Sequence, residues 1–362
     1  MAIRLTHGTR QRFRYRYGDI TIRGEVDDLV PPLARAEQRL NDAPPRPFYV
    51  EQIPDEGTDW VGGYKATPAE LRCKEEGEFC VEIGIDDPAL REGDNRLVLA
   101  TADARGRRHE ALLGFAWDPR PLPLPLDLRD LGRFQDIQEV GQAINGAFDL
   151  DRAQNLIRSR APVAPDAFLV LGSPHASQEA TYAVRFLEPA GSKWLGLADF
   201  MAGQEEGAPP RGLKVGWSSA GMAAVSPKGE ARSFIAWGDH SGREEEWAIA
   251  THPPAKVGIE KGRLYRVRHQ VCFAHGIDRV RFRVWPADQP EPDGWLCSEQ
   301  DDRVPDGLPR HRRASFGLFQ HLGHPIEWSD ILIEAHAPAP DDLPKPGAGR
   351  EPFLKRARPG AF

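Results

Sequence analysis

Arginine, glutamine and tryptophan side chains alternate with apolar ones along two successive segments, 264–273 and 279–285. Alternate side chains of a strand point to opposite faces of a sheet, so each segment predicts a strand with one apolar and one polar face. Guanidinium groups bind carboxylates and sulfates through paired hydrogen bonds, and an indole ring stacks on sugars or on cations. We therefore expect the polar face to bind an anionic ligand, unless its arginines pair with the Asp and Glu residues of neighbouring strands. The expected ligand-binding residues are Arg266, Arg268, Gln270, Arg281, Arg283 and Trp285, together with Trp237.

Two other pairs of residues could carry acid–base chemistry. His175 lies at a predicted turn that enters a strand with Tyr182, and both residue types can transfer protons in a polysaccharide lyase. Glu244 and Glu246 would share one face of a strand at about 6.5–7 Å, whereas the two carboxylates of a retaining glycosidase lie about 5–5.5 Å apart. A turn histidine and a solvated run of charge are the structural alternatives. These four residues are the catalytic candidates if the protein is an enzyme.

Metal and cofactor sites leave little trace in the sequence. Asp199 and Asp239, each near a glycine at a predicted loop, could join backbone carbonyls in a structural Ca²⁺ site. The chain contains no P-loop, no GxGxxG turn, no GxSxG elbow and no HExxH helix, so we expect no other cofactor. The cysteines lack CxxC spacing; Cys73 and Cys80 either close a hairpin disulfide or stay reduced.

The composition predicts an all-β fold for the elements that position these residues. The 362 residues include 35 glycines and 33 prolines. Short alternating segments are separated by turn signals about every 8–12 residues, which is typical of β-sandwiches. The one predicted helix spans Asp149–Ser159, with Asp149 or Asp151 as its N-cap.

Shifts in composition divide the chain into four parts. Residues 1–118 predict a β-sandwich, and residues 135–337, with about ten strands, predict a larger jelly-roll sandwich. Between them, residues 119–134 contain alternating prolines, which favour an extended, semi-rigid linker. Residues 338–362 lack periodicity and are rich in Pro, Gly and charge, so we expect a tail that is flexible unless a partner orders it.

Both predicted sandwiches resemble known families. The stretches DITIRGEVDD, RLNDAPPRPFYV and LREGDNRLVLATADARGRRHEALLGFAWD are similar to a bacterial immunoglobulin-like domain, which implies a spacer or interaction module. The stretches EATYAVRF, RLYRVRHQVCFAHGIDRVRFRVWPADQPEPDGWLC and ASFGLFQHLGHPIEWSDILIEA resemble the concanavalin A-like lectin/glucanase superfamily. That resemblance implies a ligand groove on the concave face of the sheet and, in many members, a structural Ca²⁺. If the 264–285 hairpin lies at that groove, the resemblance implies that its polar face binds an anionic poly- or oligosaccharide. The acidic E-x-D-x-E pattern of its laminarinase-like branch does not occur in the chain.

Charge and hydropathy limit the partners. The 47 basic and 54 acidic residues give a net charge of −7, which argues against nucleic acid. No apolar run approaches the roughly 18 residues of a membrane span, and no apolar signal segment follows the N-terminus, so we expect a cytoplasmic protein unless a non-classical route exports it. Our leading hypothesis is a two-domain, lectin-like carbohydrate-binding protein. The alternatives are a polysaccharide-cleaving enzyme, a lyase rather than a glycoside hydrolase, and a non-catalytic assembly protein whose C-terminal tail binds a partner or a second copy.

Overall fold

The regular secondary structure of the described residues is almost entirely β-strand, which confirms the all-β prediction. Its helical elements, among the described residues, are a 3₁₀ turn, η1 (Leu131–Arg133), and a short α-helix, α1 (Ile137–Val140). The computed structural model describes residues 2–14, 19–29, 31–52, 59–61, 64–66, 73, 75–120, 122–160, 166–188, 195–204, 217–226, 229–238, 246–251, 255–274, 277–301, 313–321, 324–337 and 353–356.

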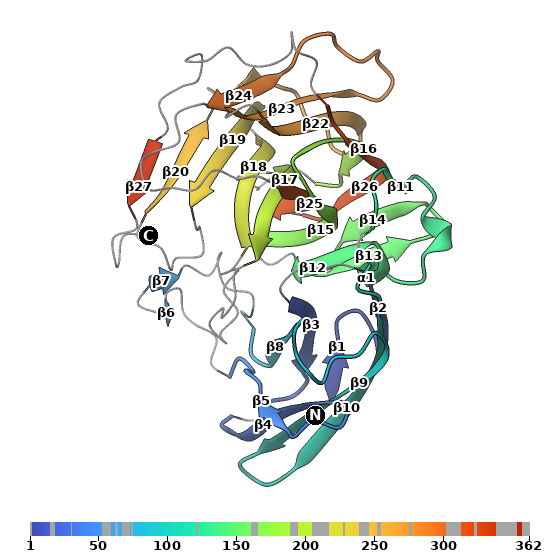
Figure 1. The fold of residues 1–362 in the computed structure, drawn as a ribbon, viewed down its shortest axis with the longest axis vertical. Helices are drawn as coiled ribbons and strands as arrows, with labels where there is room; N and C mark the ends of the chain where they lie inside the picture. The colour runs from blue at the N-terminus through green and yellow to red at the C-terminus, as the bar shows by residue number, and fades with distance from the viewer. Residues whose placement is uncertain are drawn as a thin grey trace.

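The N-terminal strands form two facing sheets, drawn in blue to cyan in Figure 1. Alternate apolar side chains of both sheets, such as Ile22, Val81, Leu97 and Phe115, meet in one buried cluster, as in a β-sandwich. The three-stranded sheet has the order β1 (Ile3–Leu5), β3 (Asp19–Val26), β8 (Glu78–Gly84). The five-stranded sheet has the order β2 (Arg10–Phe13), β10 (Arg108–Trp117), β9 (Gly93–Asp103), β4 (Leu33–Leu40), β5 (Arg46–Pro47), and a separate hairpin pairs β6 (Asp59–Val61) with β7 (Tyr64–Ala66).

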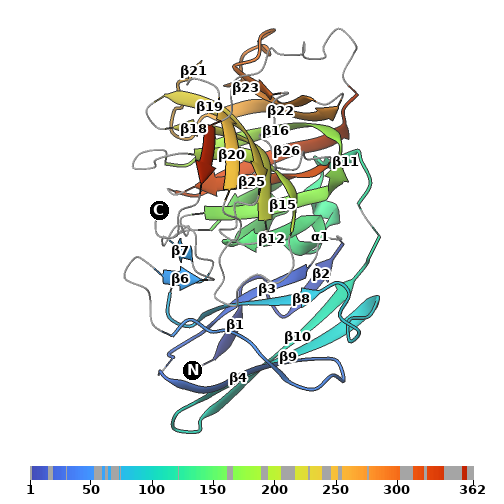
Figure 2. The same cartoon turned by 60° about the vertical axis from the view of Figure 1, so that its left-hand side comes forward.

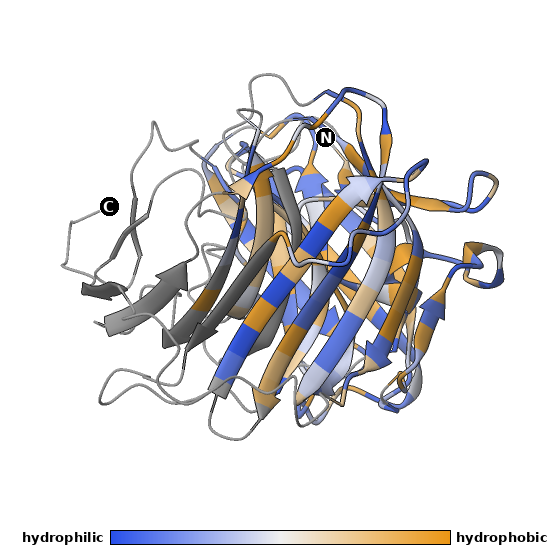
Figure 3. Cartoon of the chain, turned by 90° about the horizontal axis from the view of Figure 1, so that it is seen from above, coloured by the Kyte–Doolittle hydropathy of each residue, from blue (hydrophilic) through white to orange (hydrophobic). Residues whose placement is uncertain are grey.

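Two larger sheets form a second sandwich from the remaining strands. Hydrophobic and hydrophilic residues alternate along its strands in Figure 3, and the inward set, including Tyr182, Phe282, Phe316 and Trp328, forms one continuous core. One sheet, of eight strands, has the order β13 (Phe148–Asp151), β14 (Leu156–Ser159), β26 (Ile326–Ala335), β16 (Ser177–Phe186), β22 (Leu264–Ala274), β23 (Ile277–Pro286), β24 (Cys297–Asp301), with β11 (Leu126–Leu128) also on β26. The other, of nine strands, has the order β12 (Gly141–Asn145), β15 (Asp166–His175), β25 (Ala314–His321), β17 (Leu195–Gln204), β18 (Trp217–Ser226), β19 (Glu230–Gly238), β20 (Glu246–Thr251), β27 (Phe353–Arg356), with β21 (Ala255–Lys256) also on β19.

The two sandwiches pack against each other through β3 and β12, with the N-terminal sandwich below the larger one in Figure 2. Strand β3 is buried on both faces: its isoleucines point into the first sandwich, while Thr21 and Arg23 point to the second. The Gln142 side chain donates to Thr21 Oγ1 at 2.8 Å, and Arg23 donates to Asn145 Oδ1, also at 2.8 Å. Buried polar side chains need hydrogen-bond partners, and strand β12 supplies one to each of these two side chains of β3.

The segment expected to be a proline-rich linker is largely built into the second sandwich. Its strand β11 pairs antiparallel with β26, opposite Ile331–Ile333. Leu122, Leu126, Leu128 and Leu131 are buried in the sandwich core. The spacer prediction for residues 119–134 is therefore wrong over this stretch, because its leucines, set between the prolines, supply apolar surface that the core buries. The domain boundaries themselves stay predictions.

The predicted helix over Asp149–Ser159 is also wrong. Residues of that stretch form the β-hairpin β13–β14, in which Leu150 faces Ile157 and the turn holds Asn155 at φ 57°. Asparagine tolerates the left-handed conformation, and its side chain accepts a hydrogen bond from Leu131 N at 2.8 Å. The aspartates that predicted an N-cap, Asp149 and Asp151, belong to strand β13 instead. An N-cap does occur at Asp136, which accepts from Gln138 N and begins α1.

Part of the predicted C-terminal tail is a strand. Strand β27 pairs antiparallel with β20, so the tail binds an edge of its own nine-stranded sheet, whereas the assembly hypothesis expected it to bind a neighbouring subunit. Of residues 338–362, the structure describes 353–356, which form β27. None of the helices in the described part of the chain has the length and apolar character of a membrane span.

Candidate functional site

The arginine-rich face predicted from the sequence exists on the eight-stranded sheet. Strands β22 and β23 pair in register, which sets Arg268 opposite Arg283 and Gln270 opposite Arg281. The intervening side chains, including Val267 and Phe282, are buried in the core, so the alternation is confirmed. We name the outward set the arginine face: Arg266, Arg268, Gln270, Arg281, Arg283 and Trp285.

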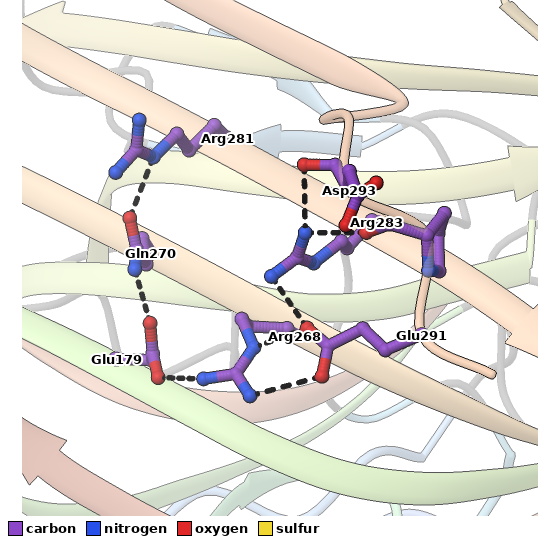
Figure 4. Close-up of polar contacts among 8 residues, drawn as sticks. Glu179, Arg268, Gln270, Arg281, Arg283, Glu291 and Asp293 are labelled. Carbon is purple, nitrogen blue, oxygen red and sulfur yellow. Dashed lines mark hydrogen bonds and ion pairs between the residues drawn. The ribbon is translucent and has the colours of Figure 1, made fainter.

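The loop between β23 and β24, residues 287–296, folds back onto the arginine face. Glu291 on this loop accepts from Arg268 with both oxygens: Oε1 lies 2.6 Å from Nε and Oε2 lies 3.1 Å from Nη2. Its Oε1 is also 2.5 Å from Arg283 Nη2. Arg283 Nη1 donates to the backbone carbonyls of Pro292 at 2.5 Å and Asp293 at 3.1 Å (Figure 4). One loop carboxylate is thus held by two guanidinium groups.

A tryptophan from the same loop completes this contact. The ring centroid of Trp295 lies 4.2 Å from Cζ of Arg281 and 4.7 Å from Cζ of Arg283. Both distances are within the range in which a guanidinium group is attracted to an aromatic face. The loop therefore contacts the arginine face through one carboxylate, two carbonyl groups and one indole ring.

Glu179 of β16 also contacts the arginine face and connects Arg268 to Gln270. Its carboxylate accepts from Arg268 Nη1 and from the Gln270 amide, and Gln270 Oε1 in turn accepts from Arg281 Nε at 2.6 Å. Figure 4 shows the resulting chain of contacts from Arg281 to Arg283. Gln270 and Arg281 are buried, at 5% and 8% exposure. Satisfied polar groups at this depth form a rigid network.

The contact between Arg268 and Glu291 favours the charged form of both side chains. The hydrogen bond from Arg268 lowers the pKa of Glu291 below its ordinary value, more than burial raises it. The same bond raises the pKa of Arg268. Two guanidinium groups, those of Arg268 and Arg283, meet the carboxylates of Glu179 and Glu291, whereas Arg281 donates to the Gln270 amide oxygen. The structural alternative stated from the sequence is therefore present for Arg268 and Arg283, which contact neighbouring carboxylates.

The pattern of paired charge continues across the sheet. Arg266 Nη1 lies 2.9 Å from Asp330 Oδ2, with both side chains about two-fifths exposed. Further along, the buried carboxylate of Glu327 is shared by Arg158 Nη2 at 2.6 Å and Arg185 Nη1 at 3.0 Å. Arg158, Arg185, Arg266, Arg268 and Arg283 on the outer face of this sheet thus each meet a carboxylate.

Trp237 and Tyr182 do not lie on the arginine face. Trp237 belongs to β19 in the nine-stranded sheet, the other layer of the sandwich, so its assignment to this face is wrong. Tyr182 is 1% exposed, and its ring centroid lies 5.5 Å from that of Phe316 inside the core. Burial raises the pKa of Tyr182 far above its usual value. A substrate on the surface cannot reach this hydroxyl, so Tyr182 as a catalytic candidate is also wrong.

The remaining catalytic and metal candidates are dispersed. His175 ends β15 opposite Ala314, and burial, then Arg313, lowers its pKa. Glu246 lies in β20, opposite Arg356 of β27, while Glu244 lies outside the described residues.

The two metal candidates do not form a described site. Asp199 lies within β17, between Met222 and Gly317, and not at a loop as predicted; Asp239 lies outside the described residues. The described part of the chain contains no group of three or more His, Cys, Asp or Glu residues that could hold a metal ion.

Three residues of the network were missed from the sequence. Glu179 had a signal, because it lies in a predicted strand and alternates with the buried Ala180 and Tyr182. Glu291 and Trp295 lie in a proline-rich loop without periodicity, and only the fold brings them to the arginine face.

A pocket lies apart from this face. Its volume is about 310 Å³, at the small end of ligand pockets. None of the predicted binding residues lines it. Its walls come from the segment before β11 and from the region of η1 and α1: Arg14, Leu122, Pro123, Pro125, Leu126, Asp127, Arg133, Phe134 and Glu139.

Comparisons with known proteins give distant structural likenesses. No protein-family model matches the chain, and no curated protein matches its sequence. The carbohydrate binding module CBM66 from Bacillus subtilis is 13% identical over 54% of this chain and 95% of that chain, with a TM-score of 0.36. A bifunctional GH43-CE protein from Bacteroides eggerthii is 11% identical over 90% of this chain and 50% of that chain, with a TM-score of 0.34. A GH131 β-glucanase catalytic domain from Podospora anserina is 11% identical over 80% of this chain and 86% of that chain, with a TM-score of 0.22. At these identities and TM-scores, the likenesses assign neither a family nor a function to the chain.

Proposed function

We propose that this protein binds a glycan, and that the glycan is anionic and binds at the arginine face. The observation that carries the proposal is the register of β22 and β23, which sets Arg268 beside Arg283 and Arg266 beside Trp285 on one outward face. Guanidinium forks match planar anionic groups, and a partly exposed tryptophan offers a stacking surface for a sugar ring. Binding is proposed ahead of catalysis because Tyr182, one of the catalytic candidates, is buried in the core.

The test is a glycan array that contains uronate, sulfated and neutral oligosaccharides, probed with the full chain. Arg283→Ala removes the hydrogen bonds of one guanidinium group to the ligand. Hydrogen bonds to charged groups contribute about 1.5–3 kcal/mol, so we expect affinity to fall about 10- to 100-fold. Arg263→Ala is the matched control, because Arg263 lies next to β22 but pairs with Glu260 and Asp288 outside the arginine face.

Two results would contradict the proposal. One is an array on which the full chain binds no glycan. The other is binding that Arg283→Ala leaves unchanged, which would place the ligand away from this face. Thermal unfolding of both variants shows that any loss of binding is not a loss of fold.

A further inference from the structure

We propose that Glu291 occupies the place of the ligand's own carboxylate: the glycan is a uronic acid polymer, and the 287–296 loop withdraws when it binds. This inference rests on the proposed glycan-binding function and names its ligand class and its regulation. It follows from how the loop contacts the arginines, which is the way a carboxylated ligand would contact them.

The coordination of Glu291 is that of a bound carboxylate. Two oxygens meet Nε and Nη2 of Arg268, and one of them also meets Nη2 of Arg283. A planar fork that donates to both oxygens of one group is the arrangement in which arginine recognises carboxylates. A uronate carboxylate has the same shape and charge as the glutamate carboxylate, so it can make the same contacts.

Of the two carboxylates in the network, Glu291 is the one that can leave. Glu179 lies in a strand that is paired on both sides, opposite Gln270 of β22 and Glu334 of β26, and its side chain is 15% exposed. Glu291 lies in a loop, outside any strand, and its side chain is 31% exposed. Withdrawal of Glu291 therefore leaves the pairing of β16, β22 and β23 intact.

The base and the tip of the loop are attached differently. At the base, Gln289 N donates to Pro286 O at 3.0 Å, Leu296 N donates to Phe282 O at 3.1 Å, and the exposed Asp288 pairs with Arg263. The tip contacts the arginine face through Glu291, the carbonyls of residues 292 and 293, and the Trp295 ring. All the tip contacts are made to guanidinium groups, which are the groups that an anionic ligand would take over.

Charge balance favours a ligand with one negative charge at this position. Without Glu291, Arg268 would keep one carboxylate, that of Glu179, and the ion pair of Arg283 with Glu291 would be lost. A ligand carboxylate restores the balance that the loop now provides. The loop and the ligand thus compete for the same donors, and the affinity of the ligand is reduced by the fraction of molecules in which the loop is closed.

The experiment is calorimetric titration of the full chain with a galacturonate hexamer, its methyl ester and a sulfated oligosaccharide of equal length. Glu291→Ala removes the internal competitor and should tighten binding of the galacturonate hexamer about tenfold, as for a site that is closed about nine-tenths of the time. Asp288→Ala is the matched control, since that carboxylate lies in the same loop but pairs with Arg263. Glu291→Gln keeps the side-chain shape and should give a smaller gain. In the unmodified chain, the hexamer should speed amide hydrogen exchange across residues 287–296.

The outcomes separate this inference from the proposed function. Galacturonate binding that is equal or weaker in Glu291→Ala, or slower exchange in the loop on binding, overturns the inference while glycan binding stands. A gain confined to the sulfated or the esterified oligosaccharide overturns the carboxylate class and likewise leaves glycan binding standing. If the unmodified chain and every variant bind none of the three ligands and no glycan on the array, the proposed function and this inference are both overturned.

Discussion

Acid should weaken the fold through one buried histidine. His269 of β22 is fully buried, with its ring centroid 6.2 Å from that of Phe282 and 6.1 Å from that of Phe316. Burial between these rings lowers its pKa to about 3, because the charged imidazolium would lose its hydration there. In the unfolded chain the same side chain titrates near its ordinary value of about 6.5.

The sign and size of the effect follow from proton linkage. Below pH 6.5, His269 binds a proton in the unfolded chain, but in the folded chain it does so only when the pH approaches 3. The free energy of unfolding therefore falls as the pH falls through this window. Each pH unit in the window is worth about 1.4 kcal/mol for one site. Between pH 7 and pH 5, His269 should therefore lower the free energy of unfolding by about 2 kcal/mol.

The measurement is urea unfolding at pH 7 and pH 5, followed by tryptophan fluorescence, for the full chain and for His269→Leu. Leucine keeps an apolar side chain of similar volume in the core and does not titrate. Other titrating groups, such as Asp136, whose pKa burial raises to about 6, contribute equally to both proteins and cancel in the difference. We expect the acid-induced loss to be about 2 kcal/mol smaller in the variant. An equal loss in both proteins would refute the reasoning.

Three further predictions concern the packing of the sheets. Glu327→Ala leaves Arg158 and Arg185 without their shared carboxylate and should lower the free energy of unfolding, measured in urea titrations, by about 1–3 kcal/mol. The control Glu25→Ala removes an exposed ion pair and should lower it by about 0.5 kcal/mol or less, so equal effects of the two variants would contradict this prediction. Gly77→Ala should lower the midpoint of thermal unfolding, because the residue has φ +93° and an added Cβ would overlap a backbone carbonyl; an unchanged midpoint would argue against this turn. Truncation after residue 337 removes β27 and uncovers the edge of β20, so sedimentation velocity should show more self-association than for the full chain, and identical profiles would contradict it.

The strands that carry the arginine face could be predicted because their signal is local. Alternation in 264–273 and 279–285 assigns each side chain to a face, and the turn between them makes them neighbours. The same logic failed for Asp149–Ser159, where two four-residue strands are too short for alternation to outweigh aspartates that resemble helix caps. A short hairpin depends on the partner that it meets, here β26, and that partner lies far along the chain.

The contact of the 287–296 loop with the arginine face could not be predicted for a related reason. Glu291 and Trp295 carry no periodic pattern, and their contacts depend on the path of a loop. The leucines between the prolines of residues 122–128 likewise enter the core only because β26 offers a free edge to β11. Sequence patterns indicate which residues share a face, whereas contacts between distant segments require the fold.

Calorimetric titration of Arg268→Ala beside the unmodified chain tests the central claim most directly, because Arg268 contacts both carboxylates of the network. The account predicts saturable binding of an anionic oligosaccharide by the unmodified chain and a loss of affinity of about 10- to 100-fold in the variant, with both proteins folded. Equal affinity in the two proteins, or no binding of any glycan by the unmodified chain, would contradict it.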